Sequence, residues 1–292
     1  MSDIVFARKK TNDIFLGKRL FQMQIVNESV QGFWPAFKFL QRNSTIQLAL
    51  KDGTDLQCRN REQAYAYCLY FYLGKRLGVY SRSELFEIIE LSEFIKHSME
   101  NVFSDYQLKY NAGAPTYFTA TLLALYVLIR YVKPDLIIQT GVASGVSSSL
   151  ILFALDKNAK GKLIDIDLPN RNEHGYRYYD GTIDTVFTPE GMQPGWLVPN
   201  KLRKRWDLRL GPSKEILPTI EKCDIFYHDS EHSYQNMMFE FEWAYAHLSD
   251  LGILASDDIH FSRAWSYFHS KRKSMYPLLG HLSFGISQRN AV

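Results

Sequence analysis

Alternating and helical hydrophobic patterns follow one another in the first third of the chain. Residues 46–59 alternate apolar and polar positions around an Asp-Gly pair, which predicts a β-hairpin. Residues 61–77 follow a helical, aromatic-rich pattern, and the sequence SRSE at 81–84 can cap another helix. We therefore expect residues 1–110 to form an N-terminal α+β appendage, to which we assign no chemistry.

From residue 111 onward, short aliphatic segments alternate with helical patterns. Thr116 can cap a helix that runs to Tyr131. Five segments have the length and composition of buried strands: 136–140, 162–166, 207–210, 224–228 and 252–256. Strands that alternate with helices are typical of a parallel sheet with crossover helices. We therefore predict that residues 111–292 form an α/β domain with a doubly wound, mostly parallel Rossmann-like sheet.

The pattern also covers the end of the chain and one long connection. A helical pattern at 262–273 precedes residues 278–287, which alternate like closing strands. The connection 169–206 is unusually long and rich in tyrosine, glycine and proline, as lids and binding loops often are. Its aromatic residues could cover a ligand or pack down the loop itself: Tyr176, Tyr178, Tyr179 and Trp196.

Small and polar residues follow the predicted strands where a ligand would bind. In a doubly wound sheet this place is the carboxyl end of the strands. The residues found there are Gly141 to Ser147, Asp167, Ser213, Asp229 and Asp257-Asp258. A carboxylate about 20 to 30 residues after a glycine turn is placed to hold the two hydroxyls of a ribose. The turn GVASGV lacks the third glycine of a dinucleotide fingerprint, so a ligand without phosphate is favoured.

Composition and charge limit the classes of binding partner and the cellular compartment that we expect. The net charge of +3 is too small to argue for nucleic acid, and the basic run at 201–206 is better explained as a solvated helix face. The longest apolar stretch, 117–132, is interrupted by Arg130 and is too short for a spanning helix. Three cysteines without metal-like spacing favour a reducing compartment. We expect a cytoplasmic protein that binds neither nucleic acid nor a membrane.

Taken together, these segments resemble the class I S-adenosylmethionine-dependent methyltransferases. Within that class they are similar to the metal-dependent O-methyltransferases of the catechol and macrolide-sugar type. The resemblance covers about residues 111–290 and is carried by QTGVASGVSS, IDIDLP, LGPSKEILP, FYHDSEHSY and LASDDI. It implies transfer of a methyl group from S-adenosylmethionine to a hydroxyl of a small molecule, such as a sugar or a secondary metabolite.

The resemblance also implies a cofactor site. The expected cofactor-binding residues are Gly141, Ala143, Gly145, Ser147, Asp167, Ser213 and Asp229. Among them, Gly141, Ala143 and Ser147 would line the methionine part. Asp167 would bind the ribose, and Ser213 would meet the adenine.

Three acids would hold a divalent metal in this family pattern: Asp229, Asp257 and Asp258. Converging carboxylates repel each other, and a hard cation such as Mg²⁺ offsets that repulsion. The metal would bind a substrate hydroxyl, lower its pKa and align its oxygen with the sulfonium methyl. Alternatively, Asp257 and Asp258 simply cap the segment that follows.

His232 and Asp229 are the expected catalytic residues. His232 lies three residues after Asp229 at the start of a helical pattern. A histidine pKa near neutrality suits a general base. His260 is the second choice, and His228 belongs to the predicted strand.

Two positions depart from the family pattern, and two other functional classes stay open. Gln139 stands where the family usually carries an acid, and Pro212 where many relatives carry an acid or a small residue. A neutral hydrogen bond in place of a charged one weakens ligand binding by about 1 kcal/mol. One alternative is a hydroxylase-like member, against which the lack of a second histidine ligand speaks. The other is a binding or assembly protein that uses the aromatic appendage as its interface, and a homo-oligomer is one such assembly.

Overall fold

A computed structural model describes residues 38–42, 45–49, 55–58, 120–169, 176–177, 183–184, 192–281 and 284–289. The chain divides into two compact units, which are described one at a time. The first contains an antiparallel sheet of β1 (Lys38–Arg42), β2 (Thr45–Ala49) and β3 (Asp55–Cys58). Ile46 pairs with Cys58, which confirms the predicted hairpin. The helices predicted at 61–77 and after 81–84, and the cap at Thr116, lie outside the described residues.

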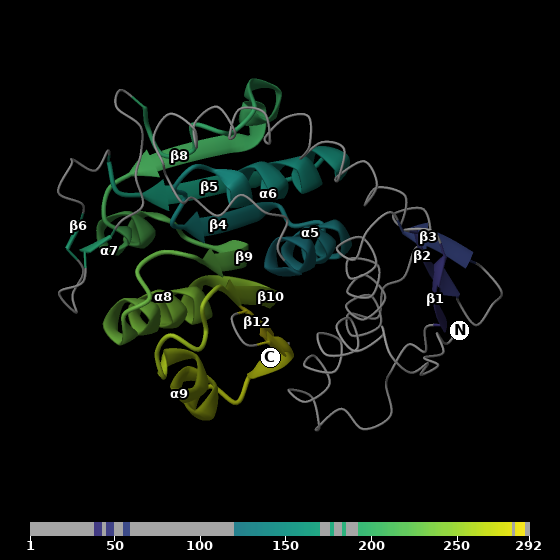
Figure 1. Cartoon of the computed structure of the whole chain (residues 1–292). Coiled ribbons are helices and arrows are strands. Elements are labelled where there is room, and N and C mark those ends of the chain that lie inside the picture. Colours follow the sequence, from purple (N-terminus) through teal and green to yellow (C-terminus); the bar gives the residue numbers. More distant parts are fainter. Residues whose placement is uncertain are drawn as a thin grey trace. The chain divides into compact units, whose positions relative to one another are not determined.

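The second unit is built on a seven-stranded sheet of order β11-β12-β10-β9-β4-β5-β8 (Figure 1). Its strands are β4 (Leu136–Thr140), β5 (Lys162–Asp167), β8 (Trp206–Leu210), β9 (Cys223–His228), β10 (Leu248–Ser256), β11 (Met275–His281) and β12 (Phe284–Arg289). The five strands from β8 to β10 are parallel, and β12 runs antiparallel to both of its neighbours. The chain builds outward from β4 to β8 and then returns to β9 on the other side of β4. This is the predicted doubly wound, mostly parallel Rossmann-like sheet.

All five strands predicted for this unit are present. β4 has the predicted bounds, whereas β10 begins at Leu248 instead of Gly252 because Leu248 already pairs with Cys223 ahead of an irregularity in the register. The predicted closing strands are the β11–β12 hairpin. Two further strands, β6 (Tyr176–Arg177) and β7 (Ile183–Asp184), pair with each other inside the long connection.

The helices of the described chain are α5 (Ala120–Val132), α6 (Val146–Lys157), η3 (Asn200–Arg205), α7 (Ser213–Ile216), η4 (Leu217–Thr219), α8 (Tyr234–His247) and α9 (Ala264–Lys271). α6 and α8 cover opposite faces of the sheet. Successive side chains of a strand point to opposite faces, and two successive residues of β4 contact the two helices. Gln139 contacts Ser148 of α6, and Thr140 contacts Glu240 of α8. Among the described helices, none has the length and apolar character needed to cross a bilayer.

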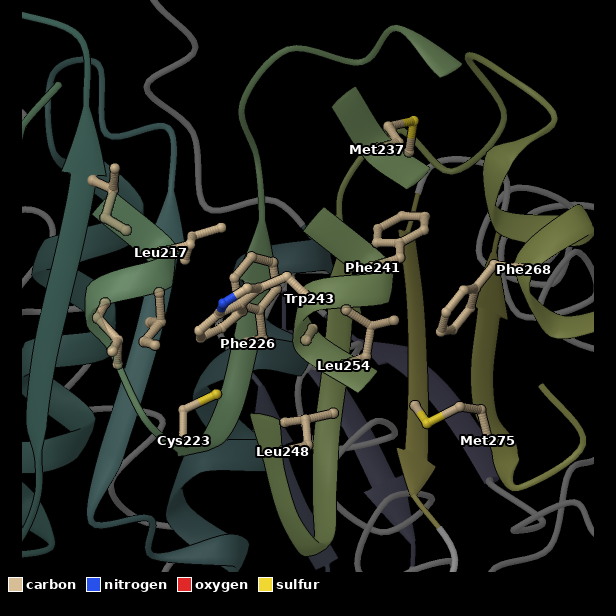
Figure 2. Close-up of a cluster of buried hydrophobic side chains, with 14 of the residues drawn as sticks. Leu217, Cys223, Phe226, Met237, Phe241, Trp243, Leu248, Leu254, Phe268 and Met275 are labelled. Atoms are coloured by element: carbon tan, nitrogen blue, oxygen red, sulfur yellow. The ribbon is translucent and has the colours of Figure 1, made fainter. Parts of the chain in front are cut away.

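Apolar side chains between the sheet and α8 and α9 form a hydrophobic core in this unit (Figure 2). Phe226 of β9 and Leu254 of β10 are fully buried in it, together with Phe241 of α8 and Phe268 of α9. The rings of Phe241 and Phe268 lie 5.6 Å apart in a tilted arrangement. Burial of each such side chain contributes on the order of 2 kcal/mol. This core therefore fixes α8 against β9 and β10, and with it the polar residues that α8 carries.

Candidate functional site

The glycine turn after β4 is shaped by close approaches of the chain to itself. Gly141 has a φ of +82°, and a Cβ there would lie 2.0 Å from the carbonyl oxygen of Asp229. Gly145 has a φ of +91°, and a Cβ there would lie 2.7 Å from the Cα of Gly195. Only glycine tolerates both the backbone angle and the contact. The turn therefore lies directly against the carboxyl end of β9 and against the last part of the long connection.

That last part of the connection is hydrogen-bonded to the turn. The N–H of Gly195 donates to the carbonyl of Ala143 at 2.8 Å, and the N–H of Leu197 donates to that of Ser144 at 2.9 Å. Trp196, one of the predicted covering residues, is half-buried beside the turn. Of the tyrosines in the same prediction, Tyr178 and Tyr179 lie outside the described residues, as does the side chain of Tyr176.

Asp167 clamps the turn from the end of β5. Its Oδ2 accepts hydrogen bonds from the N–H groups of Val142 at 3.0 Å and Ala143 at 2.9 Å. Its Oδ1 accepts from the N–H of Leu168 at 2.7 Å. The acid predicted to bind the ribose thus also orders the backbone of Ala143, another predicted cofactor residue. The ribose contact itself stays a prediction.

Gln139 holds the same turn from below. Its buried Nε2 donates to the carbonyl of Gly141 at 2.9 Å, to Ser147 Oγ at 3.1 Å and to Ser148 Oγ at 3.2 Å. A glutamate cannot donate to a carbonyl. The amide therefore suits the contact with the Gly141 carbonyl, while its Oε1 is buried without a hydrogen-bond partner among the described residues.

Sequence reasoning missed a buried acid next to Gln139. Asp165 pairs with Gln139 in the β4–β5 register and is fully buried. Burial raises the pKa of Asp165 to about 7, against the hydrogen bonds from Ser148 and Trp206. The indole of Trp206 donates to Asp165 Oδ2 at 2.7 Å. The motif IDIDLP contains both acids, so the first aspartate was a visible signal.

The backbone brings two of the predicted metal-binding acids to one edge of the sheet. The N–H of Asp229 donates to the carbonyl of Thr140 on β4 at 2.9 Å. The N–H of Asp257 donates to the carbonyl of His228 on β9 at 2.9 Å. Asp229 and Asp257 therefore extend neighbouring parallel strands by one residue, and Asp258 follows directly.

The charges of these acids affect one another. Burial raises the pKa of Asp229 well above its usual value, and the charges of Asp257 and Asp258 add to the rise. The phenol of Tyr227 opposes it by donating to Asp229 Oδ2 at 3.2 Å. Burial and the charge of Asp258 raise the pKa of Asp257 to about 6. The structure thus gathers carboxyl groups at this edge, where burial and their neighbours make ionisation less favourable.

The acids at this edge have the chemistry of metal ligands, and their grouping in space is a separate requirement. Carboxylate oxygens are the ligands that Mg²⁺ prefers. Within the described ranges, however, no three side chains of histidine, cysteine, aspartate or glutamate are grouped so that they could hold an ion. Asp258 also has a φ of +45°, in the left-handed region that non-glycine residues seldom adopt. The donor chemistry fits a hard cation, but the coordination geometry does not.

His232 lies at the acidic edge and is half-buried just before Ser233, whose hydroxyl caps α8. Burial and the charge of His228 lower the pKa of His232 to about 3, well below the near-neutral value expected for a base. Its Nε2 is buried and has no hydrogen-bond partner in the described part of the chain. The ring stands edge-on to His228 at 5.2 Å and lies 5.9 Å from Phe261. His260, the second choice, is exposed.

The predicted adenine-side turn contacts α8. Pro212 precedes α7 with a φ of −60°, which its ring favours. A hydrogen bond from Ser213 helps to lower the pKa of Glu240. The Ser213 hydroxyl is therefore engaged with a buried acid, and its contact with adenine stays a prediction.

Glu240 is the second residue that sequence reasoning missed, although the sequence contained a signal for it. Met237, Phe241 and Ala244 form an apolar stripe on α8, and Glu240 lies three residues after Met237 on that same buried face. Glu240 is fully buried, and so is its partner His228. A polar residue on the apolar face of a helix predicts a buried partner.

A doubly wound sheet with an acid-clamped glycine turn at its switch point defines a Rossmann-like ligand-binding domain. Residues 138–259 match the family model described as a methyltransferase domain. This match agrees with the resemblance of the sequence to the class I, S-adenosylmethionine-dependent methyltransferases. The match to this family model identifies the chain as a methyltransferase.

Several solved structures are similar to the chain. An O-methyltransferase from Bacillus cereus in complex with SAH has 13% identity and a TM-score of 0.46, with 68% of this chain and 91% of that chain covered. A methyltransferase from Geobacter sulfurreducens has 16% identity and a TM-score of 0.46, with 65% and 87% covered. The SAH-bound methyltransferase PaMTH1 from Podospora anserina has 13% identity and a TM-score of 0.45, with 73% and 98% covered. A comparison with curated proteins found no match.

Proposed function

We propose that the protein transfers the methyl group of S-adenosylmethionine to a hydroxyl of a small molecule, such as a sugar or a secondary metabolite. The observation that carries the proposal is the edge of the sheet where the clamped glycine turn lies against Asp229, with Asp257 at the end of the neighbouring strand and His232 three residues after Asp229. A glycine turn without a phosphate-binding pattern suits this cofactor. Its positive sulfonium is attracted to gathered carboxylates.

The proposed reaction balances with groups that the chain provides. The acceptor oxygen attacks the methyl carbon, the carbon–sulfur bond breaks, and S-adenosylhomocysteine leaves. The proton of the hydroxyl passes to the ring of His232, which is neutral at physiological pH because its pKa is about 3. Burial disfavours the imidazolium, whereas the charge of Glu240 favours it.

A divalent metal is the finer part of the proposal. It rests on the raised pKa values of Asp229 and Asp257, to which burial contributes most and neighbouring carboxylates add, and which a bound cation would lower. When bound, Mg²⁺ would lower the pKa of the acceptor hydroxyl. Because the described residues do not form a coordination group as they stand, no step above depends on the ion.

Calorimetric titration of the full chain with S-adenosylmethionine, and in parallel with NAD, tests the cofactor. We expect binding of S-adenosylmethionine alone. Binding of neither ligand would overturn the methyltransferase proposal in favour of an assembly protein, and binding of NAD would point to a different chemistry.

Methyl transfer to a panel of hydroxylated acceptors tests the acidic edge. Asp257→Asn is expected to reduce turnover at least about a hundredfold, as loss of an essential charged group does, with no fall in the melting temperature. The matched control is Asp250→Asn, an exposed position on the same strand. Turnover that is unchanged in a chelator would remove the metal from the proposal, and unchanged turnover in Asp257→Asn would remove the acid.

A further inference from the structure

A single buried carboxylate joins the ends of the two strands, β4 and β9, that lead into the candidate site. Glu240 Oε2 accepts hydrogen bonds from Thr140 Oγ1 and from His228 Nδ1, each at 2.6 Å. Its Oε1 accepts from Ser230 Oγ at 3.1 Å and from Asn236 Nδ2 at 3.3 Å. Acids are almost never fully buried unless they are paired, and this one is paired on both oxygens.

The partners of Glu240 flank the functional turns. Thr140 and His228 are register partners on β4 and β9. Thr140 directly precedes the glycine turn at Gly141, and His228 directly precedes Asp229. One carboxylate on α8 therefore fixes the points from which both turns depart.

The charge of Glu240 is maintained by the same contacts. Burial raises its pKa, but the charge and hydrogen bond of His228 and the hydrogen bonds from Thr140 and Ser213 outweigh burial and lower it. Hydrogen bonds to an ionised acceptor are shorter and stronger than neutral ones. The ionised carboxylate therefore restrains the side chains of His228, Thr140 and Ser213 through strong hydrogen bonds.

The link continues from His228 to His232. Because Nδ1 of His228 is held by Glu240, Nε2 is the nitrogen that remains, and it is buried without a partner among the described residues. The ring of His228 stands at 83° to that of His232, with 5.2 Å between the ring centroids. The orientation of His228 thus limits how the ring of His232 can pack.

We propose that Glu240 is a positioning residue of the candidate site: it holds the glycine turn through Thr140 and orients His232 through His228. The consequence for catalysis rests on the proposed function. The arrangement of the two histidines does not, because it concerns only contacts within the chain.

The main test compares Glu240→Gln with Glu242→Gln in the full chain. Both residues lie on α8, but Glu242 pairs with Arg272 at 2.6 Å, and both of those side chains are 38% exposed. We expect Glu240→Gln to weaken binding of S-adenosylmethionine roughly 10- to 100-fold, as the loss of charge-assisted hydrogen bonds does. We also expect it to shift the ring ¹⁵N NMR signals of both His228 and His232. Glu242→Gln should leave both measurements unchanged.

A purely structural role for Glu240 predicts a different result. The melting temperature would fall in Glu240→Gln, while cofactor affinity and the His232 signals stayed at wild-type values at a temperature where the variant is folded. That outcome would overturn the proposal. If the wild-type chain does not bind S-adenosylmethionine, the proposed function fails, but the NMR comparison still decides whether Glu240 orients the histidines.

Thr140→Val keeps the test valid if Glu240→Gln does not fold. The substitution preserves the shape of the side chain and removes only the hydroxyl that donates to Glu240. We expect roughly tenfold weaker binding of S-adenosylmethionine, the usual cost of one lost hydrogen bond, with the His228 signals unchanged. Wild-type affinity in this variant would refute the role assigned to the Thr140 contact.

Discussion

An acid lies at each end of strand β9, Asp224 within it and Asp229 directly after it, and the two ends are built differently. Near the amino end, Asp224 accepts from the N–H groups of Asp135 at 2.7 Å and Leu136 at 3.0 Å, and from Ser249 Oγ at 2.7 Å. Burial raises its pKa, but these hydrogen bonds and the charge of Lys160 outweigh burial, so its pKa lies below the usual value. At the carboxyl end, the pKa of Asp229 is raised well above it.

The difference shows which end is arranged for stability and which for function. A carboxylate whose pKa is lowered stabilises the fold at neutral pH, and one whose pKa is raised destabilises it. Gathered acids with raised pKa values persist at functional sites because the chemistry needs them. The amino end of the sheet is therefore a scaffold, and the carboxyl end is the candidate site.

The largest predicted effect separates two glycines that are similarly constrained. Gly141→Ala at the carboxyl end would place a Cβ 2.0 Å from Asp229 O, and Gly161→Ala at the amino end would place one 2.3 Å from Pro134 O. Both variants should lose about 1 to 3 kcal/mol of stability, the cost of a strained backbone. Only Gly141→Ala should also lose affinity for S-adenosylmethionine, by more than about a hundredfold, since a 1 Å displacement of a site has that order of effect.

Urea unfolding and calorimetry measure the two quantities separately. Equal losses of cofactor affinity in both variants would mean that binding follows global stability. The two ends of the sheet would then not differ in function.

The second prediction compares asparagine substitutions of the two acids at the ends of β9. Asp224→Asn should lower the free energy of unfolding by about 1 kcal/mol, because an amide accepts the same N–H groups less strongly. Asp229→Asn should leave the stability unchanged or higher, because it removes a charge that Asp257 and Asp258 repel. Affinity for S-adenosylmethionine should fall in Asp229→Asn and stay close to the wild-type value in Asp224→Asn. A stability loss in Asp229→Asn as large as in Asp224→Asn would contradict the contrast.

The third prediction concerns pH and Asp257. Its pKa is raised to about 6 in the folded chain, against about 3.9 for an unfolded aspartate. Between these values the folded state binds more protons than the unfolded state, so this group lowers stability as the pH rises from 4 to 6. Asp224, whose pKa is lowered, acts in the opposite sense and loses its contribution as the pH falls through its folded pKa.

Urea unfolding from about pH 3.5 to 7.5 tests the prediction for Asp257, since this range includes the pKa of its carboxyl in both the folded and the unfolded chain. The stability of Asp257→Asn relative to the wild-type chain should increase across the interval from 4 to 6 and then level off. A constant difference would mean that the carboxyl of Asp257 titrates alike in the folded and unfolded chains.

Strand ends were predictable from the sequence because aliphatic runs that stop at glycine or aspartate mark them. The positions of Gly141, Asp167 and Asp229 at one edge followed from that pattern and from the rules of parallel sheets. The Glu240 cluster did not follow, because periodicity places a residue on a helix face without naming its partner on a strand. The low pKa of His232 was equally hidden, since it depends on burial beside His228.

The smallest predicted effect uses two exposed apolar side chains on opposite ends of the sheet. Phe261 follows the acidic pair, is 65% exposed and lies 5.9 Å from the ring of His232. Leu251, near the amino end of β10, is 52% exposed. Neither truncation to alanine should change the melting temperature by much, because exposed side chains contribute little to stability. Phe261→Ala should raise the KM for the acceptor about tenfold, the scale of one lost apolar contact in a binding pocket, at unchanged affinity for S-adenosylmethionine. Leu251→Ala should change neither quantity, and an unchanged acceptor KM in Phe261→Ala would place the acceptor away from the β10–α9 loop.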